Sequence, residues 1–340
     1  MGIMEDHVKS QGDEQSVSAH RTGQALWIEA AGRCDLRHET VPAIRPGEVL
    51  VRTLYSGISR GTESLVFEGR VPQSEFERMR GPGMEGHFPF PVKYGYSAVG
   101  VIEAGPSELM EREVFCLHPH QDFFVVPAER VTILPVSLPA RRAILAANME
   151  TALNVVWDAQ IQPGDRVAVF GAGVVGALIA YLSSRIAGTE TVLIDREPRR
   201  AALAAALGLT FSSPGDLAGE FDVIVNATAS EQVLEAAIGL AGLEARIVEA
   251  SWYGDRSVTL PLGGAFHARR LSLVSSQVGH LPASHRARWT YSRRLAKALD
   301  LLLDVRLDAL ISGETPFSEL SAAYARILSR PDTLCHRIRY

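Results

Sequence analysis

After residue 165 the sequence alternates short apolar strands with helices, and this alternation constrains the fold more than any other feature. The first expected strand is RVAVF at 166–170, and the first expected helix is VVGALIAYLSSRIAG at 174–188. Further strands are expected at 191–195, 222–228, 245–251 and 271–277, with helices at 199–208 and 231–241 and a last helix around 288–304. Such alternation predicts an α/β fold, a doubly wound parallel sheet covered by helices on both faces.

Gly171, Gly173 and Gly176 satisfy the G-x-G-x-x-G pattern between the first strand and the first helix. Gly171 allows the tight turn, Gly173 lets the backbone approach a pyrophosphate, and Gly176 permits close packing of helix on strand. The free N–H groups and the dipole of the helix N-terminus favour phosphate. The turn therefore predicts a dinucleotide site in a Rossmann unit, with a glycine-rich turn without ligand as the alternative. The expected contacts come from Gly171, Ala172, Gly173, Val174, Val175 and Gly176.

Asp195 ends the next strand, 19 residues beyond Gly176. A carboxylate at this place accepts hydrogen bonds from the ribose hydroxyls and repels a 2'-phosphate, so we expect NAD, with NADP as the alternative. Arg196, Arg199 and Arg200 follow closely and would weaken that preference if they faced the ribose. We include Arg196 and Arg200 among the cofactor-binding candidates.

The first part of the chain is different, because residues 24–134 consist of short β-branched runs interrupted by Gly and Pro. A helical segment follows at 140–159, with five apolar residues on one face: Leu145, Met149, Ala152, Leu153 and Val156. We expect four parts in the chain. They are a flexible tail at 1–20, a β-rich unit at 21–148, the Rossmann unit at 149–287, and a segment at 288–340 that returns to the β-rich unit.

Composition limits the class of protein. With 340 residues, 46% of them apolar and 21% charged, the chain can fill two cores. The 34 basic and 39 acidic residues form no electrostatic footprint for nucleic acid, so we expect a small-molecule partner. The longest uncharged stretch, 167–182, is shorter than a membrane span. Neither a signal peptide nor a disulfide framework is expected, and the three scattered cysteines indicate a cytoplasmic protein.

Together these features resemble the medium-chain dehydrogenase/reductase family, the alcohol dehydrogenase superfamily, over residues 24–340. Its landmarks here are LYSGISRGTES at 54–64, PVKYGYSAVGVIEAG at 91–105, METALNVV at 149–156 and PGDRVAVFGAGVVG at 163–176. The resemblance implies a GroES-like β-rich catalytic domain next to the Rossmann domain. It also implies a homodimer whose Rossmann sheets pair edge to edge around 271–277.

Zinc-dependent members carry metal ligands in these landmarks, and this sequence departs from them. Ser59 stands where a cysteine ligand is usual, with Thr62 and Glu63 following, and Gly95-Tyr96-Ser97 replaces Gly-His-Glu. The third ligand position falls at or beside Asn148, and the cysteines of the structural zinc lobe are missing. Neutral hydroxyl and amide groups are poor zinc ligands, so we expect no metal and no zinc. A different site built from Glu63, Glu150, His118 and His120 is the alternative.

The catalytic candidates without zinc are hydroxyl groups and histidines. Ser59 and Thr62 would hydrogen-bond the substrate oxygen or relay its proton, and Tyr96 would donate to a developing alkoxide if its pKa were depressed. One of the pair His118 and His120 would act as an acid/base near neutral pH if it lay near the substrate. Each of these residues also has an ordinary structural explanation, in packing, capping or a surface loop.

The resemblance adds candidates around the nicotinamide. Thr151 matches the residue that packs beside it, Asn226, Ala227 and Thr228 end the strand near the ribose, and Ser276 and Gln277 point to the carboxamide edge. Trp252 and Tyr253 line the same crevice or merely cover it.

The leading prediction is an enzyme, a zinc-independent NAD(P)-dependent dehydrogenase of secondary alcohols or polyols. The loop SGISRGTE is also similar to that of bacteriochlorophyllide hydroxyethyl dehydrogenases, which implies a hydroxyl on a larger ring compound as one substrate. Two alternatives remain: a zinc-free reductase of quinones or other activated C=C bonds, and a dinucleotide-binding protein without catalysis.

Overall fold

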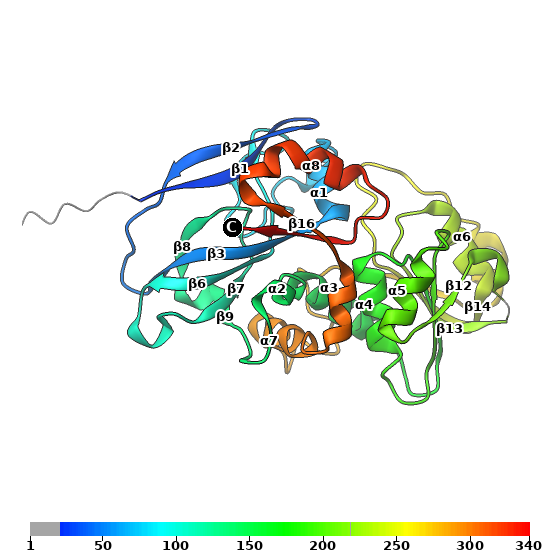
Figure 1. The fold of residues 1–340 in the computed structure, drawn as a ribbon. Helices are drawn as coiled ribbons and strands as arrows, with labels where there is room; N and C mark the ends of the chain where they lie inside the picture. The colour runs from blue at the N-terminus through cyan, green and yellow to red at the C-terminus, as the bar shows by residue number, and fades with distance from the viewer. Residues whose placement is uncertain (1–20, 218) are drawn as a thin grey trace, which may run out of the picture.

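The computed structural model describes residues 21–217 and 219–340, so the expected tail at 1–20 lies outside the described residues. A β-rich unit and an α/β unit lie side by side in it (Figure 1). The α/β expectation and the division into a GroES-like and a Rossmann architecture are confirmed.

Two sheets build the β-rich unit. The smaller has the strand order β2-β1-β5-β4, and the larger has the order β16-β17-β3-β6-β7-β9 with β8 also paired to β3. Their apolar side chains form two cores, since successive residues of a strand face opposite sides. The strands are β1 Thr22–Ala30, β2 Arg33–Thr40, β3 Glu48–Ser59, β4 Glu85–Gly86, β5 Val92–Lys93, β6 Ala98–Ala104, β7 Glu113–Cys116, β8 Phe123–Pro127 and β9 Val131–Ile133. The helices are α1 Arg60–Phe67 and α2 Ala140–Ala143.

The Rossmann unit is a parallel sheet in the order β12-β11-β10-β13-β14-β15. Its order reverses between β10 and β13, and in open α/β sheets ligands bind at this switch point. The strands are β10 Arg166–Phe170, β11 Glu190–Ile194, β12 Thr210–Ser212, β13 Phe221–Asn226, β14 Ala241–Glu249 and β15 Ser272–Ser275. The helices are α3 Ala146–Ala159, α4 Val174–Ser183, α5 Arg200–Leu207, α6 Glu231–Leu240 and α7 Tyr291–Leu301.

Two elements differ from the sequence expectation. Strand β12 is only three residues long and was not predicted, because its run TFS is too short for a periodic signal. The single helix expected at 140–159 is two helices, α2 and α3. Its expected apolar face is nevertheless buried, with Leu145, Met149, Ala152 and Leu153 in the core.

The C-terminal segment returns to the β-rich unit through β16 Ile311–Pro316, α8 Leu320–Ser329 and β17 Cys335–Arg339. Strand β17 pairs antiparallel with the second half of β3, with Cys335 opposite Ser59. The chain end therefore lies among the strands of the β-rich unit (Figure 1). This return places the last residues of the chain beside the strand that leads into α1.

Candidate active site

The glycine turn after β10 is forced by backbone contacts. Gly171 has φ +102°, and a Cβ there would lie 2.9 Å from the carbonyl oxygen of Ala227. A Cβ on Gly176 would lie 1.9 Å from the carbonyl oxygen of Gly171, so only glycine lets α4 pack this closely. Gly173 differs, because its Cβ would meet nothing within 4 Å. The open space above Gly173 and the N-terminus of α4 together fit a pyrophosphate.

The switch point joins this turn to the end of β13. Ala227 donates its backbone N–H to the Phe170 oxygen at 2.9 Å, and the Thr228 methyl group lies against Gly171. Asn226 is fully buried and its side chain is occupied, since Nδ2 donates to Glu249 Oε2 at 2.8 Å and Oδ1 accepts from the Thr228 hydroxyl at 2.6 Å. The Asn226 side chain thus stabilises the end of β13 by internal hydrogen bonds. Ala227 and Thr228 lie against the glycine turn at Gly171.

The ends of β14 and the following loop complete this brace. The Asn226 amide also donates to the Tyr253 hydroxyl at 3.2 Å, and Tyr253 donates to Glu249 at 3.1 Å. Burial raises the pKa of Glu249 and hydrogen bonds oppose that rise. Trp252 is turned away from this group, because it packs against the core of the β-rich unit.

Asp195 follows β11 and is tied to the glycine turn. Its Oδ2 accepts from the Ala172 N–H at 2.7 Å and its Oδ1 accepts from the Glu197 N–H at 2.9 Å. A carboxylate oxygen accepts more than one hydrogen bond, so both oxygens can still receive ribose hydroxyls. The charge and place of Asp195 fit the adenosine end of a dinucleotide.

The arginines after Asp195 have separate surroundings. Arg200 donates to the carbonyl oxygen of Pro331 at 2.7 Å, and Arg199 forms an exposed pair with Glu197. Arg196 is exposed. Only Arg200 among them is held by the returning C-terminal segment.

Arg60 is a candidate that the sequence reasoning missed. It is the first residue of α1 and donates to the carbonyl oxygen of Arg330 at 3.0 Å. Burial and then the nearby Arg200 lower its pKa, while Asp332 and Asp195 oppose that shift. Arg60 therefore brings positive charge from the β-rich unit to the Asp195 side of the cofactor site. Its position directly after Ser59, in a landmark of the resemblance, was the available signal.

The residues expected near the nicotinamide make mainly internal contacts. Thr151 donates to the Ala147 carbonyl oxygen at 2.9 Å within α3, and Ser276 donates to Asp158 at 2.7 Å. Gln277 is exposed and accepts from the Gly279 N–H at 2.6 Å. The hydroxyl and amide groups of these residues are therefore engaged in hydrogen bonds within the protein.

A buried arginine on α7 holds this side together. Arg294 donates to Glu150 at 3.0 Å and to the Val278 carbonyl oxygen at 2.6 Å. Burial raises the pKa of Glu150 and the charge of Arg294 opposes that rise. The carboxylate of Glu150 is thus committed to an ion pair.

Three predicted hydroxyl residues are brought together at the end of β3. The hydroxyls of Ser59 and Thr62 lie close enough to the Tyr96 phenol to lower its pKa, and Asn148 on α3 donates to Ser59 Oγ at 3.3 Å. We call Ser59, Thr62, Tyr96 and Asn148 the hydroxyl cluster. Burial raises the pKa of Tyr96 to about 12, Glu63 adds to the rise, and the two hydroxyls oppose it. The expectation of a lowered pKa for Tyr96 is therefore wrong. The phenol keeps its proton at neutral pH and is able to donate a hydrogen bond.

The run KYGYSAVG divides its hydroxyl residues between packing and chemistry. Tyr94 is 4% exposed in the core of the β-rich unit, and Ser97 donates to the Ile144 carbonyl oxygen. Tyr96 retains some exposure and belongs to the hydroxyl cluster. It is therefore the residue of this run that is available to a substrate.

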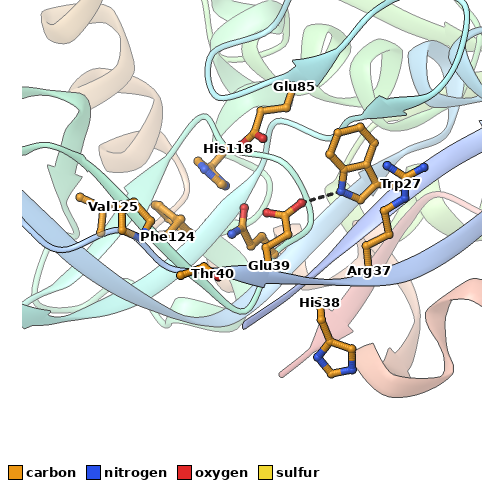
Figure 2. A pocket seen from close by; sticks show the side chains of 11 residues that line it. Trp27, Arg37, His38, Glu39, Thr40, Glu85, His118, Phe124 and Val125 are labelled. Atoms are coloured by element: carbon orange, nitrogen blue, oxygen red, sulfur yellow. Dashed lines mark hydrogen bonds between the residues drawn. The ribbon is translucent and has the colours of Figure 1, made fainter. Parts of the chain in front are cut away.

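The two candidate histidines face different parts of the molecule. His118 lines a cavity of about 590 Å³ with Trp27, Glu39 and Glu85, and its ring stacks on Phe124 at 3.8 Å (Figure 2). Burial lowers the pKa of His118 to about 3, so it is neutral at pH 7. The prediction of an acid/base titrating near neutral pH is wrong for His118.

His120 is fully buried behind the hydroxyl cluster. Its Nε2 lies 3.0 Å from Glu63 Oε2, and its Nδ1 lies 2.7 Å from Ser56 Oγ. Neither His118 nor His120 is hydrogen-bonded to Ser59, Thr62 or Tyr96. Both rings therefore contact other groups than the hydroxyl cluster.

The donor chemistry of the hydroxyl cluster does not fit zinc. Ser59, Tyr96 and Asn148 offer a hydroxyl, a phenol and an amide, whereas zinc binds thiolate, imidazole or carboxylate. Over residues 21–217 and 219–340, no group of three or more His, Cys, Asp or Glu is arranged to hold a metal ion. Of the four residues of the alternative site, Glu63 and His120 are in contact, whereas Glu150 pairs with Arg294 and His118 lies in its own cavity.

No protein-family model matches the sequence. A curated relative, 2-desacetyl-2-hydroxyethyl bacteriochlorophyllide A dehydrogenase of Rhodobacter capsulatus, is 25% identical over 307 residues, which cover 85% of this chain and 89% of the relative. The resemblance expected for the loop SGISRGTE thus extends over most of the chain.

Solved structures share the fold at low identity. L-idonate 5-dehydrogenase of Escherichia coli K-12 matches with a TM-score of 0.79 and 15% identity, over 94% of this chain and 99% of that one. A structure described as a short chain alcohol dehydrogenase of Escherichia coli CFT073, complexed with NADH, matches with a TM-score of 0.76 and 17% identity over the same shares. The solved structures confirm the expected fold, and both they and the sequence relative are dehydrogenases. Within the described ranges, every helix is too short or too polar to cross a membrane.

Proposed function

We propose that this protein transfers a hydride between a secondary alcohol and NAD without zinc, the alcohol being a polyol or a hydroxyl on a larger ring. The observation that carries the proposal is the hydroxyl cluster, in which Ser59, Tyr96 and Asn148 meet at the three positions where the resemblance would put metal ligands. The bacteriochlorophyllide dehydrogenase similarity supports a secondary alcohol.

The cofactor would be held by the turn at 171–176, the N-terminus of α4 and Asp195, with Arg60 adding positive charge. When bound, the nicotinamide supplies or accepts the hydride. Thr151, Ser276 and Gln277 would shape the nicotinamide end through the backbone that they brace. The carboxylate of Asp195 favours NAD, and NADP is the alternative because Arg60, Arg196 and Arg200 lie nearby.

The protein would bind the substrate oxygen through hydrogen bonds from the hydroxyl cluster. Tyr96 holds its proton at neutral pH and donates to the oxygen, which is stabilising while negative charge develops there. Ser59 Oγ accepts from Asn148, and its single proton would turn from the Tyr96 phenol to the substrate oxygen. Thr62 lies near the phenol and would help to orient it.

The test is a panel of secondary alcohols and polyols with NAD⁺ or NADP⁺, followed by absorbance of the reduced cofactor. Turnover of a secondary alcohol, faster with NAD⁺, is expected. Reduction of enones or quinones by NADH without any alcohol turnover would instead favour the C=C reductase, which also needs no metal. Tight NADH binding with no turnover of any compound would favour a binding protein without catalysis.

We also propose the domain boundaries, the oligomeric state and the cellular location of the protein. The parts are the GroES-like domain at 21–148, the Rossmann domain at 149–287 and the returning segment at 288–340. The assembly is a homodimer through the edge strand β15, where Leu273 is 37% exposed. The three free cysteines support a cytoplasmic location. Light scattering on the purified protein tests the dimer.

A further inference from the structure

A chain of buried polar side chains lies behind the hydroxyl cluster. Glu63 Oε2 accepts from the Tyr324 hydroxyl at 2.7 Å and lies 3.0 Å from His120 Nε2. His120 Nδ1 lies 2.7 Å from Ser56 Oγ, which lies 2.9 Å from the Tyr340 hydroxyl. We call Glu63, His120, Ser56, Tyr324 and Tyr340 the Glu63 network.

The network joins segments that are far apart in the sequence. Glu63 is on α1, Ser56 on β3, Tyr324 on α8, and His120 on the connection between β7 and β8. Tyr340 is the last residue printed in the sequence, and its N–H donates to the Leu54 carbonyl oxygen at 3.1 Å. The C-terminal segment thus supplies two members of the network, Tyr324 and Tyr340.

Burial makes the hydrogen bonds of this network costly to lose. Glu63, His120, Ser56 and Tyr324 each have 0% exposure, and a buried polar group that loses its partner is destabilising, more so if it is charged. Glu63 meets this cost with three partners, because its Oε1 accepts from the Ser59 N–H at 2.7 Å in addition to the contacts of Oε2. Its carboxylate therefore has one preferred orientation.

The network touches the hydroxyl cluster on two sides. On the first side, Glu63 Oε1 holds the backbone of Ser59. On the second side, His120 packs against the turn that carries Tyr96, since a Cβ on Gly95 would lie 2.9 Å from the His120 ring. The backbone N–H of His120 also donates to the Tyr94 carbonyl oxygen at 3.4 Å. His120 therefore sets the spacing between the backbone of Ser59 and that of Tyr96.

We propose that Glu63 and His120 are positioning residues, which hold Ser59 and Tyr96 in register for the substrate oxygen. Tyr340 and Ser56 fix the rotation of the His120 ring from behind. This inference deepens the proposed function and rests on it, because the register matters only if the two hydroxyls bind the reacting oxygen. A misplacement of about 1 Å in such a pair can cost about 100-fold in rate.

The test compares two substitutions of His120. His120→Leu removes the contact with Glu63 Oε2, whereas His120→Gln keeps an N–H that can reach it. We expect kcat with a turned-over alcohol to fall at least about tenfold in His120→Leu and to be partly restored in His120→Gln. The Kd for NADH should stay within about twofold in both, because neither substitution touches the glycine turn at 171–176, which we call the cofactor cradle.

The matched control is His336→Leu, which removes a half-buried histidine from β17, the strand next to β3. His336 Nε2 lies 2.8 Å from Thr315 Oγ1, and the His336 side chain is not hydrogen-bonded to any member of the network. This control should lose stability while kcat per NADH-binding site is unchanged. Equal kcat in His120→Leu, His120→Gln and the wild type would overturn the positioning role.

A second readout needs no substrate. Amide hydrogen exchange at Ser59 reports the bond from its N–H to Glu63, and we expect protection to fall about tenfold in His120→Leu but not in His336→Leu. If no alcohol is turned over by the wild type, the proposed function fails while this readout still tests the positioning. Unchanged Ser59 protection in His120→Leu would contradict the inference.

Discussion

The cofactor cradle and the hydroxyl cluster are built in opposite ways. The cradle is made of backbone within one short run, where Gly176 packs so closely on Gly171 that no side chain fits. The hydroxyl cluster is made of side chains from β3, α1, α3 and the loop between β5 and β6, with buried polar groups behind it. A backbone site tolerates few residue types, whereas a side-chain site exchanges its chemistry while the fold is kept.

The largest effect is expected in the cradle. Gly176→Ala forces a Cβ to within 1.9 Å of a backbone oxygen, so α4 must shift. We expect about 3 kcal/mol of lost stability and loss of NADH binding. Gly173→Ala is the control, because its Cβ meets nothing within 4 Å. It should keep the stability of the cofactor-free protein and weaken only NADH binding, as seen by thermal unfolding and NADH fluorescence. Equal thermal stability of Gly176→Ala and the wild type would contradict this view.

The hydroxyl cluster should respond in rate rather than in cofactor affinity. Tyr96→Phe removes the phenol that we propose to donate to the substrate oxygen, and we expect kcat to fall about 100-fold with the Kd for NADH unchanged. Tyr94→Phe is the matched control, since Tyr94 is on the same turn with its ring 6.1 Å away and is buried in the core. Steady-state kinetics should leave this control near the wild type. A Tyr96→Phe enzyme with full kcat would remove Tyr96 from the mechanism.

The cavity at His118 lies outside both sites and should affect only stability. Burial lowers the pKa of His118 to about 3 from an unfolded value of about 6.5, so the unfolded chain binds a proton that the folded chain rejects. Above pH 6.5 this group does not lower the free energy of unfolding, because His118 is neutral in both states. As the pH falls from 6.5 toward 3, the free energy of unfolding decreases. Between pH 7 and 5 the wild type should lose about 2 kcal/mol more than His118→Leu. Denaturant unfolding at both pH values measures this, with exposed His280→Asn as control. Parallel losses in His118→Leu and the wild type would refute it.

The smallest effect is expected at the adenosine end of the cradle. Asp195→Asn removes the charge that would repel a 2'-phosphate, and we expect the preference for NADH over NADPH to fall about tenfold. Glu197→Gln removes the same charge nearby, where the side chain pairs with exposed Arg199, and should leave the preference unchanged. Competitive binding of the two cofactors measures the ratio. An unchanged ratio in Asp195→Asn would mean that the arginines set cofactor choice.

The same contrast explains what the sequence could predict. The parallel sheet and the glycine turn follow from periodicity and spacing within short segments, so both were predictable. The meeting of Ser59, Thr62 and Tyr96 was also expected, but from the resemblance and not from spacing. The directions of His118 and His120 were not predictable, since the connection that carries them is not part of a strand and has no periodic orientation.

Contacts between residues far apart in the sequence were the other feature that could not be predicted. The contact between Glu63 and Tyr324 joins residues 261 positions apart, and no local pattern indicates it. Arg60 was missed for a related reason, because its neighbours Asp195 and Arg200 belong to the other unit. Such partners become visible only when the C-terminal segment is seen to return beside β3.

The central claim is that the hydroxyl cluster works without zinc, and zinc content measured together with turnover tests it most directly. Protein purified without a metal-affinity step would be analysed for zinc and assayed with NAD⁺ and a secondary alcohol before and after treatment with a chelator. The account predicts less than about 0.1 zinc per chain and turnover that the chelator does not change. Close to one tightly held zinc per chain, with turnover lost on chelation, would contradict it.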